Sequence, residues 1–362
     1  MSAIVAYPLP QQEVGGTAGS TLSDRLFGCG IVDVMDISIV IPTWRGKYLL
    51  ETYLPSVLEA SKFYCDSCGA DTEIIVVEDA GGDDTVSWLQ SRYKDSIRTL
   101  KHEQNQGFCV ACKTGFESAR FPIVLLLNND VRLKKDCIAP FVRHFKDRDV
   151  FAVTGKMFNQ KEDSFCNGGK IAQFRRGMWS GYLNYDVDSS TNEDTFLLSF
   201  AAIGAFSAYD REKFLSIGGF DPLISMYEDI EISYRAWKMG WTVKYEPGSV
   251  AFHDASQTMK RRYKFDSGHA LARRSRIWMH WILLHDHGMF GQHLFSIFIR
   301  IMTSWLWLDW PFYWAIFTGL QKMGSIRRKR RENRQKARRS DREILKLLEH
   351  FRLTAPIIIR QV

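Results

Sequence analysis

Two apolar segments of the sequence end directly on acids or amides. Residues 125–130 read LLLNND and residues 76–79 read VVED, so each predicted strand stops at side chains that disfavour strands. Asn128, Asn129 and Asp130 could form a turn through their own backbone. They could instead form a ligand site, because acids gathered at one sheet edge favour a bound cation or a donor-rich ligand.

A second acidic group begins a predicted helix further along the chain. Apolar residues recur at helical spacing in residues 226–237, which places Glu228 and Asp229 in the first turn. Acids there are either acid–base groups or charges that favour the helix macrodipole, and we interpret Glu231 as the latter. His253 ends the next predicted strand, where a histidine is either packed in the core or a metal ligand.

The elements that must position these residues alternate strictly in the first third of the chain. Strands are predicted at 37–42, 72–79, 97–103 and 121–130, and helices at 48–64, 84–93 and 108–119. Such alternation predicts an α/β fold with a mostly parallel sheet that is flanked by helices. Ligands bind outside the carboxyl ends of the strands in such sheets, where Asp79 and Asp130 fall.

The positive charge of the sequence gathers near the C-terminus. The 362 residues carry a formal net charge of +7, and residues 327–342 hold ten basic and two acidic residues. The rest of the chain is therefore close to neutral. The length accommodates a catalytic domain of about 200–250 residues with additions.

The cysteines and the N-terminus bear on the compartment. No basic segment followed by an apolar one begins the chain, so we expect no secretory signal. Seven cysteines, an odd number, favour reduced thiols and a cytoplasmic protein. The pairs Cys65/Cys68 and Cys109/Cys112 have zinc-ribbon spacing. We nevertheless expect no zinc, because the predicted topology separates the pairs by one strand length, roughly 17–20 Å.

The C-terminal third is aromatic. Six of the eleven tryptophans lie between Trp278 and Trp314, and Arg300 and Asp309 interrupt the stretch, so no run of about 18 uncharged apolar residues could span a bilayer. With the basic residues that follow, the stretch predicts helices that lie on the membrane surface across residues 275–342. The alternative is a helical subdomain that packs on the catalytic domain or on a second copy in a homo-oligomer.

Six segments resemble a known family in their order. They are ISIVIPTW, EIIVVEDAGGDD, NQGFCVAC, IVLLLNNDV, IGGFDPLISMYEDIEISYRAWKMGW and VKYEPGSVAFH. The sequence is similar to the family 2 inverting glycosyltransferases of GT-A fold, in particular to non-processive, rhamnosyltransferase-like enzymes of bacterial surface polysaccharide synthesis. The implied domains are a loosely ordered lead-in (1–35), a GT-A domain (36–256, with a nucleotide-binding half 36–131 and an acceptor and catalytic half 132–256), an aromatic helical region (257–325) and a basic helix with a tail (326–362).

The resemblance assigns roles at the nucleotide end of the expected site. Pro42, Thr43 and Asp79 match contacts to the nucleotide, although Asp79 could also be the N-cap of the next helix. Asn128 stands at the first position of the family's DXD motif, and Asp130 matches its metal-binding acid. His253 matches a second metal ligand or a diphosphate contact. The expected cofactor is Mg²⁺ or Mn²⁺, which few protein groups hold beside phosphate oxygens.

The resemblance also assigns roles at the acceptor end. Asp229 matches the catalytic base, with Glu228 before it, and a single base implies inversion. The family's loop for sugar and acceptor matches Gly219, Phe220 and Asp221, while Lys260, Arg261 and Arg262 either cover the diphosphate or form a solvated face. The implied reaction moves a sugar from a nucleotide-diphosphate sugar to a saccharide or a polyprenyl-linked acceptor, on the cytoplasmic face of the membrane.

Two other classes compete with this expectation. A nucleic-acid-binding protein would place residues 327–342 on a phosphate backbone, but that leaves the acidic sheet edge unexplained. A nucleotidyltransferase would share the nucleotide and the metal, yet it needs a glycine-rich basic first loop, which residues 42–48 match poorly. We therefore expect a nucleotide sugar, and no nucleic acid, as the partner.

Overall fold

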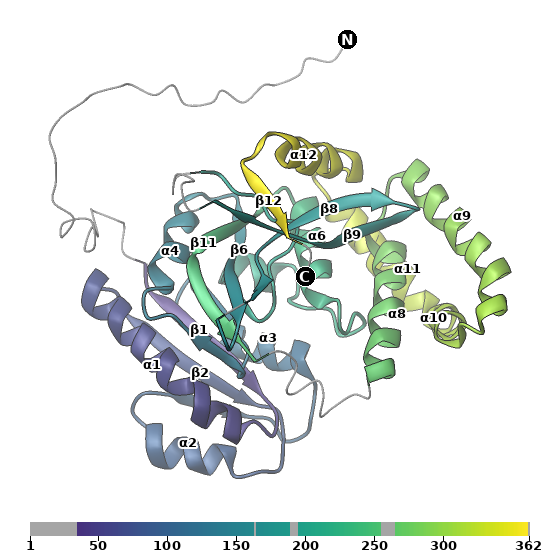
Figure 1. Ribbon diagram of the computed structural model, residues 1–362. Coiled ribbons are helices and arrows are strands. Elements are labelled where there is room, and N and C mark those ends of the chain that lie inside the picture. The colour runs from purple at the N-terminus through teal and green to yellow at the C-terminus, as the bar shows by residue number, and fades with distance from the viewer. Residues whose placement is uncertain (1–34, 163, 189–194, 255–264, 361–362) are drawn as a thin grey trace, which may run out of the picture. The chain divides into compact units, whose positions relative to one another are not determined.

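The computed structural model describes residues 35–162, 164–188, 195–254 and 265–360. The predicted lead-in lies outside these residues except for Met35, and so do Lys260, Arg261 and Arg262. The first half of the described chain alternates strands and helices as the sequence predicts (Figure 1). Its elements are β1 (Ile37–Thr43), α1 (Lys47–Cys68), β2 (Thr72–Glu78), α2 (Thr85–Tyr93), β3 (Arg98–Lys101), α3 (Phe108–Ser118) and β4 (Ile123–Leu127).

The second half extends the same sheet beyond β4. The parallel strands β3-β2-β1-β4 continue into β10-β6-β11-β5, and β7 pairs with β6. Because β10, β5 and β7 are antiparallel to their neighbours, six of the nine strands share one direction. The added elements are β5 (Val131–Leu133), α4 (Ile138–Val142), η1 (Arg143–Lys146), β6 (Val150–Asn159), β7 (Phe165–Asn167), β10 (Phe206–Asp210), α5 (Arg211–Ser216), α6 (Glu228–Lys238) and β11 (Thr242–His253).

Both faces of the central strands are buried. Side chains alternate between faces along a strand, so Leu125 and Leu127 of β4 join one core cluster while Val124 and Leu126 join the other. Helices α1, α2 and α4 supply the first cluster, and α3 and α6 supply the second. Cover on both faces is what the continuous apolar run in β4 predicts.

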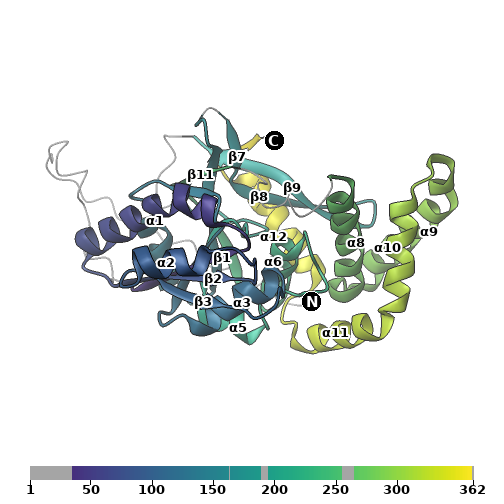
Figure 2. The same ribbon diagram turned by 90° about the horizontal axis from the view of Figure 1, so that it is seen from below.

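The C-terminal third packs on the same unit, and Figure 2 shows its helices α8 to α11 beside the sheet. Its elements are α8 (Phe265–Leu283), α9 (His287–Thr303), η2 (Ser304–Trp307), α10 (Trp310–Gln321), α11 (Met323–Lys336), α12 (Asp341–Thr354) and β12 (Ile357–Arg360). In the described part of the chain, no helix has the length and apolar character needed to cross a membrane.

The segment predicted as a basic helix with a tail is packed into the fold. β12 pairs antiparallel with β9 (Met178–Val187), which pairs in turn with β8 (Gly169–Arg175), so the end of the described chain completes a three-stranded sheet. The first residue of α12, Asp341, is 1% exposed. Its carboxylate accepts hydrogen bonds from the Tyr234 hydroxyl, the Lys238 ammonium and the backbone N–H of His285 and Asp286, and so ties α12 to α6.

Candidate active site

A cavity of about 510 Å³ opens at the carboxyl ends of β1 and β4. Eight candidate residues that the sequence analysis named line this cavity together, although they come from five separate segments. They are Pro42, Thr43, Asp79, Asn128, Asp130, Glu228, Asp229 and His253. Parallel strands present their carboxyl ends at one edge, which explains why residues so far apart in sequence meet here.

Asp79, directly after β2, organises one wall of the cavity. Its carboxylate accepts hydrogen bonds from the backbone N–H of Gln106 (2.8 Å) and Gly107 (2.7 Å), and it bonds to His102 Nδ1 at 2.8 Å. Asp79 therefore does not cap α2, whose N-cap residue is Asp84. Gly107, at φ +87°, occupies a conformation that favours glycine and leads the chain into α3.

A buried side-chain bond joins the ends of β1 and β4. Asn129 Nδ2 donates to Thr43 Oγ1 at 2.8 Å, and both residues line the cavity. Gly46 lies against this pair, because a Cβ there would come 2.1 Å from Thr43 Oγ1 and 2.4 Å from Asn129 Nδ2. The second amide of the LLLNND segment thus fixes the β1 loop, a role that sequence alone did not assign.

Asp130 and His253 meet because of strand pairing. His253, the last residue of β11, is in register with Val131 of β5, the residue after Asp130. Asp130 Oδ1 lies 3.2 Å from His253 Nε2, yet neither atom forms a hydrogen bond within the described residues. A buried carboxylate oxygen and a ring nitrogen that converge without partners are suited to a shared divalent cation.

These two residues are the metal-binding candidates that the structure brings together. The described residues contain no group of three or more His, Cys, Asp or Glu side chains arranged to hold a metal ion. A cation at Asp130 and His253 would therefore take its remaining ligands from phosphate oxygens and water, as Mg²⁺ and Mn²⁺ do beside nucleotides. The cysteine pairs lie elsewhere, with Cys65 and Cys68 at the end of α1 and with Cys109 and Cys112 in α3.

Glu228 and Asp229 begin α6 and line the cavity side by side. Glu228 Oε2 accepts the backbone N–H of Tyr227 (2.7 Å), and Asp229 Oδ1 accepts that of Ile230 (2.8 Å). Burial, together with the charge of Asp229, raises the pKa of Glu228 to about 7. Burial also raises the pKa of Asp229, against the opposing effects of the Ile230 N–H and the Lys170 ammonium.

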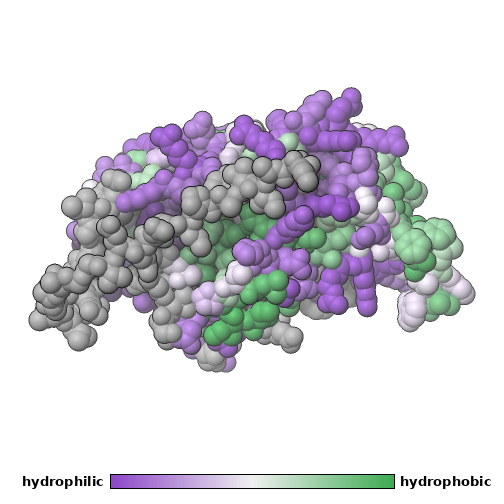
Figure 3. Space-filling view, turned by 90° about the horizontal axis from the view of Figure 1, so that it is seen from above, coloured by the Kyte–Doolittle hydropathy of each residue, from purple (hydrophilic) through white to green (hydrophobic). Residues whose placement is uncertain are grey.

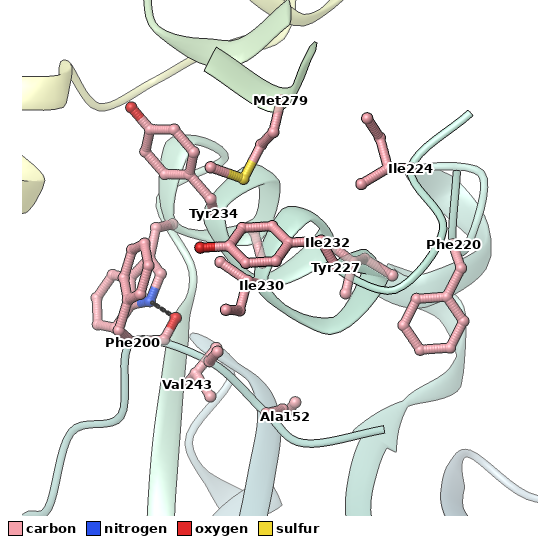
Figure 4. Packing of buried hydrophobic residues seen from close by; sticks show 14 of the residues in the cluster. Ala152, Phe200, Phe220, Ile224, Tyr227, Ile230, Ile232, Tyr234, Val243 and Met279 are labelled. Carbon is pink, nitrogen blue, oxygen red and sulfur yellow. Dashed lines mark hydrogen bonds between the residues drawn. The ribbon is translucent and has the colours of Figure 1, made fainter. Parts of the chain in front are cut away.

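Helix α6 is held rigidly behind these acids. Figure 4 shows Ile230 and Tyr234 of α6 among Phe200, Val243 and Met279. On the same helix the indole of Trp237 donates to the Phe200 carbonyl at 3.1 Å. Glu231 lies in the first turn of α6, as expected of a helix-start charge. Its side chain is fully buried and pairs with Arg235 at 2.7 Å, because the next turn of the helix faces the core.

The loop before α6 supports the site without lining it at the expected positions. The carbonyl of Gly219 accepts a bond from Arg235, and the ring of Phe220 packs 5.2 Å from that of Phe214. Asp221 is buried and pairs with Lys329 of α11 at 2.9 Å. Gly219, Phe220 and Asp221 are therefore absent from the cavity wall, to which the same loop contributes Pro222, Ser225 and Met226.

Several lining residues were not identified from the sequence. Residues 106–109 and Ala111 form the wall at the start of α3, and residues 203–205 form another ahead of β10. Trp44 lines the cavity, and Arg45 stacks over its ring at 4.9 Å. Lys170 of β8 was also missed, although its charge acts on Asp229 and burial lowers its pKa to about 8. The motif segments ISIVIPTW and NQGFCVAC contain Trp44 and the residues at the start of α3, but the resemblance assigns them no role. Residues 203–205 and Lys170 lie outside every motif segment.

Comparison with known proteins agrees with the resemblance seen in the motifs. The model of the family described as Glycosyl transferase family 2 matches residues 38–218. Human polypeptide N-acetylgalactosaminyltransferase 18 is 26% identical over 199 residues, which are 50% of this chain and 32% of the relative. The poly-beta-1,6-N-acetyl-D-glucosamine synthase of Staphylococcus aureus (strain COL) is 21% identical over 254 residues, which are 68% of this chain and 57% of the relative. The chain thus spans between a third and just over half of these relatives.

The fold also matches that of a solved glycosyltransferase. A crystal structure of GalNAc-T7 with UDP, GalNAc and Mn²⁺ superposes with a TM-score of 0.53 and 17% identity, and the match covers 71% of this chain and 49% of that one. At this identity the likeness shows the fold alone. The nine-stranded sheet with its flanking helices is therefore an α/β fold of GT-A type.

Proposed function

Since the chain belongs to glycosyl transferase family 2 and is a glycosyltransferase, we propose that it moves a sugar from a nucleotide-diphosphate sugar to a hydroxyl of a saccharide or lipid-linked acceptor, with inversion. The observation that supports this proposal most strongly is a single cavity at the carboxyl edge of the sheet. Asp130 and His253, whose facing side-chain atoms lack hydrogen-bond partners within the described residues, line this cavity together with Glu228 and Asp229. A transferase needs both groups, one for a leaving diphosphate and one for the incoming hydroxyl.

The nucleotide is assigned to the wall formed by the β1 loop and the start of α3. Pro42 and Thr43 would lie under the base, with Asn128 beside them. Asp79 holds Gln106 and Gly107 in place, so its contribution to nucleotide binding is to position that wall. The GalNAc-T7 complex contains UDP and GalNAc, which supports this class of donor, and the chain offers Trp44 as a further flat surface for a base.

The diphosphate is assigned to Asp130, His253 and a divalent cation. The fit rests on two converging, unpartnered ligand atoms, and the GalNAc-T7 complex contains Mn²⁺. A bound Mg²⁺ or Mn²⁺ would supply positive charge that stabilises the departing diphosphate. We also assign Lys260, Arg261 and Arg262 to the phosphates, since they follow His253 by only seven to nine residues.

Asp229 is assigned as the base that removes the proton of the acceptor hydroxyl as the hydroxyl attacks the anomeric carbon. The raised pKa of Asp229 makes it a better base than an ordinary aspartate. Glu228, with a pKa of about 7, is partly protonated near neutral pH, which lowers the repulsion between the two acids. Attack with one base and direct departure of the diphosphate inverts the anomeric carbon, because no enzyme carboxylate forms a bond to the sugar.

The acceptor is assigned to the loop before α6. Ser225 and Met226 line the cavity next to Glu228, while Asp221 and Phe220 anchor the loop from behind. This arrangement moves the expected acceptor contacts a few residues toward the helix. Polysaccharide synthases among the relatives support a saccharide acceptor.

The proposal is tested with purified protein, a panel of UDP-, GDP- and dTDP-sugars, Mn²⁺ and saccharide or polyprenyl-phosphate acceptors. We expect one donor to bind and to yield free nucleoside diphosphate, with the anomeric configuration of the product inverted by NMR. A nucleotidyltransferase would instead leave these nucleotide sugars uncleaved, and would release pyrophosphate only when given a nucleoside triphosphate and a sugar phosphate. A product that retains configuration would remove Asp229 from the role of sole base.

A further inference from the structure

An apolar surface lies on α9, η2 and α10, and we call it the aromatic rim. It holds thirteen of the seventeen large hydrophobic side chains that are exposed in the described chain, so it is a gathered surface rather than scattered residues. Figure 3 shows hydrophobic side chains at the end of the molecule where α9 and α10 lie. The rim consists of Leu294, Phe295, Phe298, Ile299, Met302, Trp305, Leu306, Trp307, Leu308, Trp310, Trp314, Phe317 and Leu320.

Both helices of the rim are apolar on two opposite faces. In α9, His293 and Ile297 are buried, while Leu294, Phe295 and Phe298 on the other side are 47%, 65% and 55% exposed. In α10, Phe312, Ala315 and Gly319 face α8, while Trp310, Trp314 and Phe317 are exposed. A helix that is apolar all round is stable when its second face also leaves water. The rim therefore has the pattern of a surface that something apolar covers.

The charge around the rim is positive. Asp309 is the single acid between Met289 and Ser325 in the sequence, and it is ion-paired with both Arg273 and Arg300. Helix α11 begins two residues after α10 ends. Its exposed cations, with those beside it, form what we call the basic stripe: Lys322, Arg327, Arg328, Arg331, Arg334, Lys336 and Arg338.

Other cations of the same segment serve the fold and do not belong to the stripe. Lys329 pairs with Asp221, Arg330 donates to the Trp281 carbonyl, and Arg339 donates to the Trp241 carbonyl. The cations of the basic segment thus form two sets. The inner set holds α11 and α12 to the rest of the fold, and the outer set faces solvent.

We propose that the aromatic rim docks into the interface of an anionic lipid bilayer, with the basic stripe on the lipid headgroups. Tryptophan favours the boundary between hydrocarbon and water, and four of the rim residues are tryptophans. Apolar burial and cationic attraction act together in surface-bound helices. Docking of this kind uses helices that lie on the bilayer, in keeping with the lack of a spanning helix in the described chain. The inference stands on the surface alone and does not depend on the sugar-transfer proposal.

A second copy of this chain fits the rim less well. A twofold interface places the same patch on both partners, so a second copy would bring another positively charged patch, which repels the first. No free acid in the rim would offset that repulsion, since Asp309 is already paired twice. An anionic bilayer instead supplies negative charge around an apolar interior, which matches both parts of the surface.

The insertion is tested by flotation of the full chain with phosphatidylglycerol–phosphatidylcholine vesicles at physiological salt. Trp307→Glu with Trp310→Glu is expected to weaken binding at least about tenfold, because both side chains are exposed and would enter the interface. The matched control is Leu353→Glu, which changes a residue that is 69% exposed on α12, and it should bind as the wild type does. Unchanged thermal melting shows that each variant is folded.

The charge is tested with Arg327, Arg328 and Arg331 changed together to glutamine. Each cation near an anionic surface strengthens binding about fivefold. The loss of three cations should therefore weaken binding to anionic vesicles roughly a hundredfold. A control with Lys62, Arg92 and Lys94 changed to glutamine removes three exposed cations from α1, α2 and the C-cap of α2, and it should bind normally. Equal binding to neutral vesicles, or equal loss in the control, would overturn the role of the stripe.

The oligomeric outcome is measured in the same samples. If the wild type fails to float with vesicles, the proposal is overturned. If it also forms a dimer in sedimentation equilibrium that the Trp307 and Trp310 variant abolishes, a second copy is the occupant of the rim. A monomer that floats with anionic vesicles, and that loses flotation only in the rim and stripe variants, supports the bilayer.

Discussion

Lys329 of α11 forms an ion pair of 2.9 Å with Asp221, the buried acid in the loop that leads to Glu228 and Asp229. A helix outside the main sheet therefore holds a loop of the candidate active site. The pair joins a residue in the basic C-terminal segment to one that the motifs place near the acceptor. The two regions are thus in direct contact.

Lys329→Gln should loosen this loop. The change removes the positive charge that pairs with the buried Asp221 carboxylate, so we expect the free energy of unfolding to fall by about 1–3 kcal/mol. Transfer should fall while donor binding is retained, because the loop serves the acceptor side. Calorimetry, donor titration and a transfer assay with a water-soluble acceptor measure the three quantities. Arg331→Gln, an exposed position on the same helix, is the control, and an equal effect there would argue against the Asp221 contact.

Asp229→Asn should abolish transfer and leave donor binding within about twofold, because the proposed base acts on the acceptor. The asparagine can still accept the Ile230 N–H through its carbonyl, so α6 keeps its first turn. Isothermal titration with the donor and a transfer assay separate the two functions. Near-normal turnover in this variant would show that another group is the base.

Lys170→Met should move the acidic limb of the pH profile of kcat toward higher pH. The Lys170 ammonium favours the charged form of Asp229, so its removal raises the pKa of the Asp229 carboxyl further. The base then loses its proton only at higher pH. Arg175→Gln, an exposed cation on the same strand, should leave the profile unchanged. A shift toward lower pH would contradict the proposed interaction.

Glu228→Gln should stabilise the protein at pH 8 and make little difference at pH 4. The folded state raises the pKa of Glu228 from 4.5 to about 7, so its ionisation costs stability as pH rises through that window. At pH 8 the cost is fully present, on the order of 3 kcal/mol, and the uncharged glutamine avoids it. Denaturant unfolding at both pH values tests the sign. A wild type that gains stability relative to the variant from pH 4 to pH 8 would refute it.

Asp130→Asn and His253→Gln should each weaken Mn²⁺ binding in the presence of nucleoside diphosphate. We expect the loss of the carboxylate charge to matter more, about a hundredfold against about tenfold for the imidazole. Electron paramagnetic resonance counts free Mn²⁺ and needs no turnover. Asp136→Asn, a partly exposed acid in the connection after β5, serves as the control. Wild-type affinity in both variants would place the metal elsewhere.

The sequence predicts the sheet well because its signals there are local. The strands around Val40 and Leu125 are short runs of β-branched or apolar residues, and each run is bounded by residues that stop a strand. The strand ends at Asp79 and Asp130 then follow from parallel pairing, so their meeting in one cavity is predicted by topology rather than by any long-range sequence signal.

The rest of the site depends on partners distant in sequence. The meeting of His253 with Asp130 needs the antiparallel pairing of β11 with β5, which no local pattern encodes. Glu231 is predicted as a helix-start charge, but its burial and its pairing with Arg235 depend on the core behind α6. In the same way Asp341 lies in a basic run that predicts a helix on the membrane surface, whereas the fold buries it against Lys238.

The pairing of β12 with β9 bears on how the chain tolerates shortening. A chain cut before Ile357 would lose the strand that covers one side of β9 and leave a row of unpaired backbone groups from Asn184 to Val187. Such a bare edge is a template for pairing between molecules, so the shortened protein should form β-rich aggregates even though every residue of the cavity remains. β12 thus protects the protein against self-association through β9. A purification tag is therefore better attached by a flexible linker than by replacing the residues of β12.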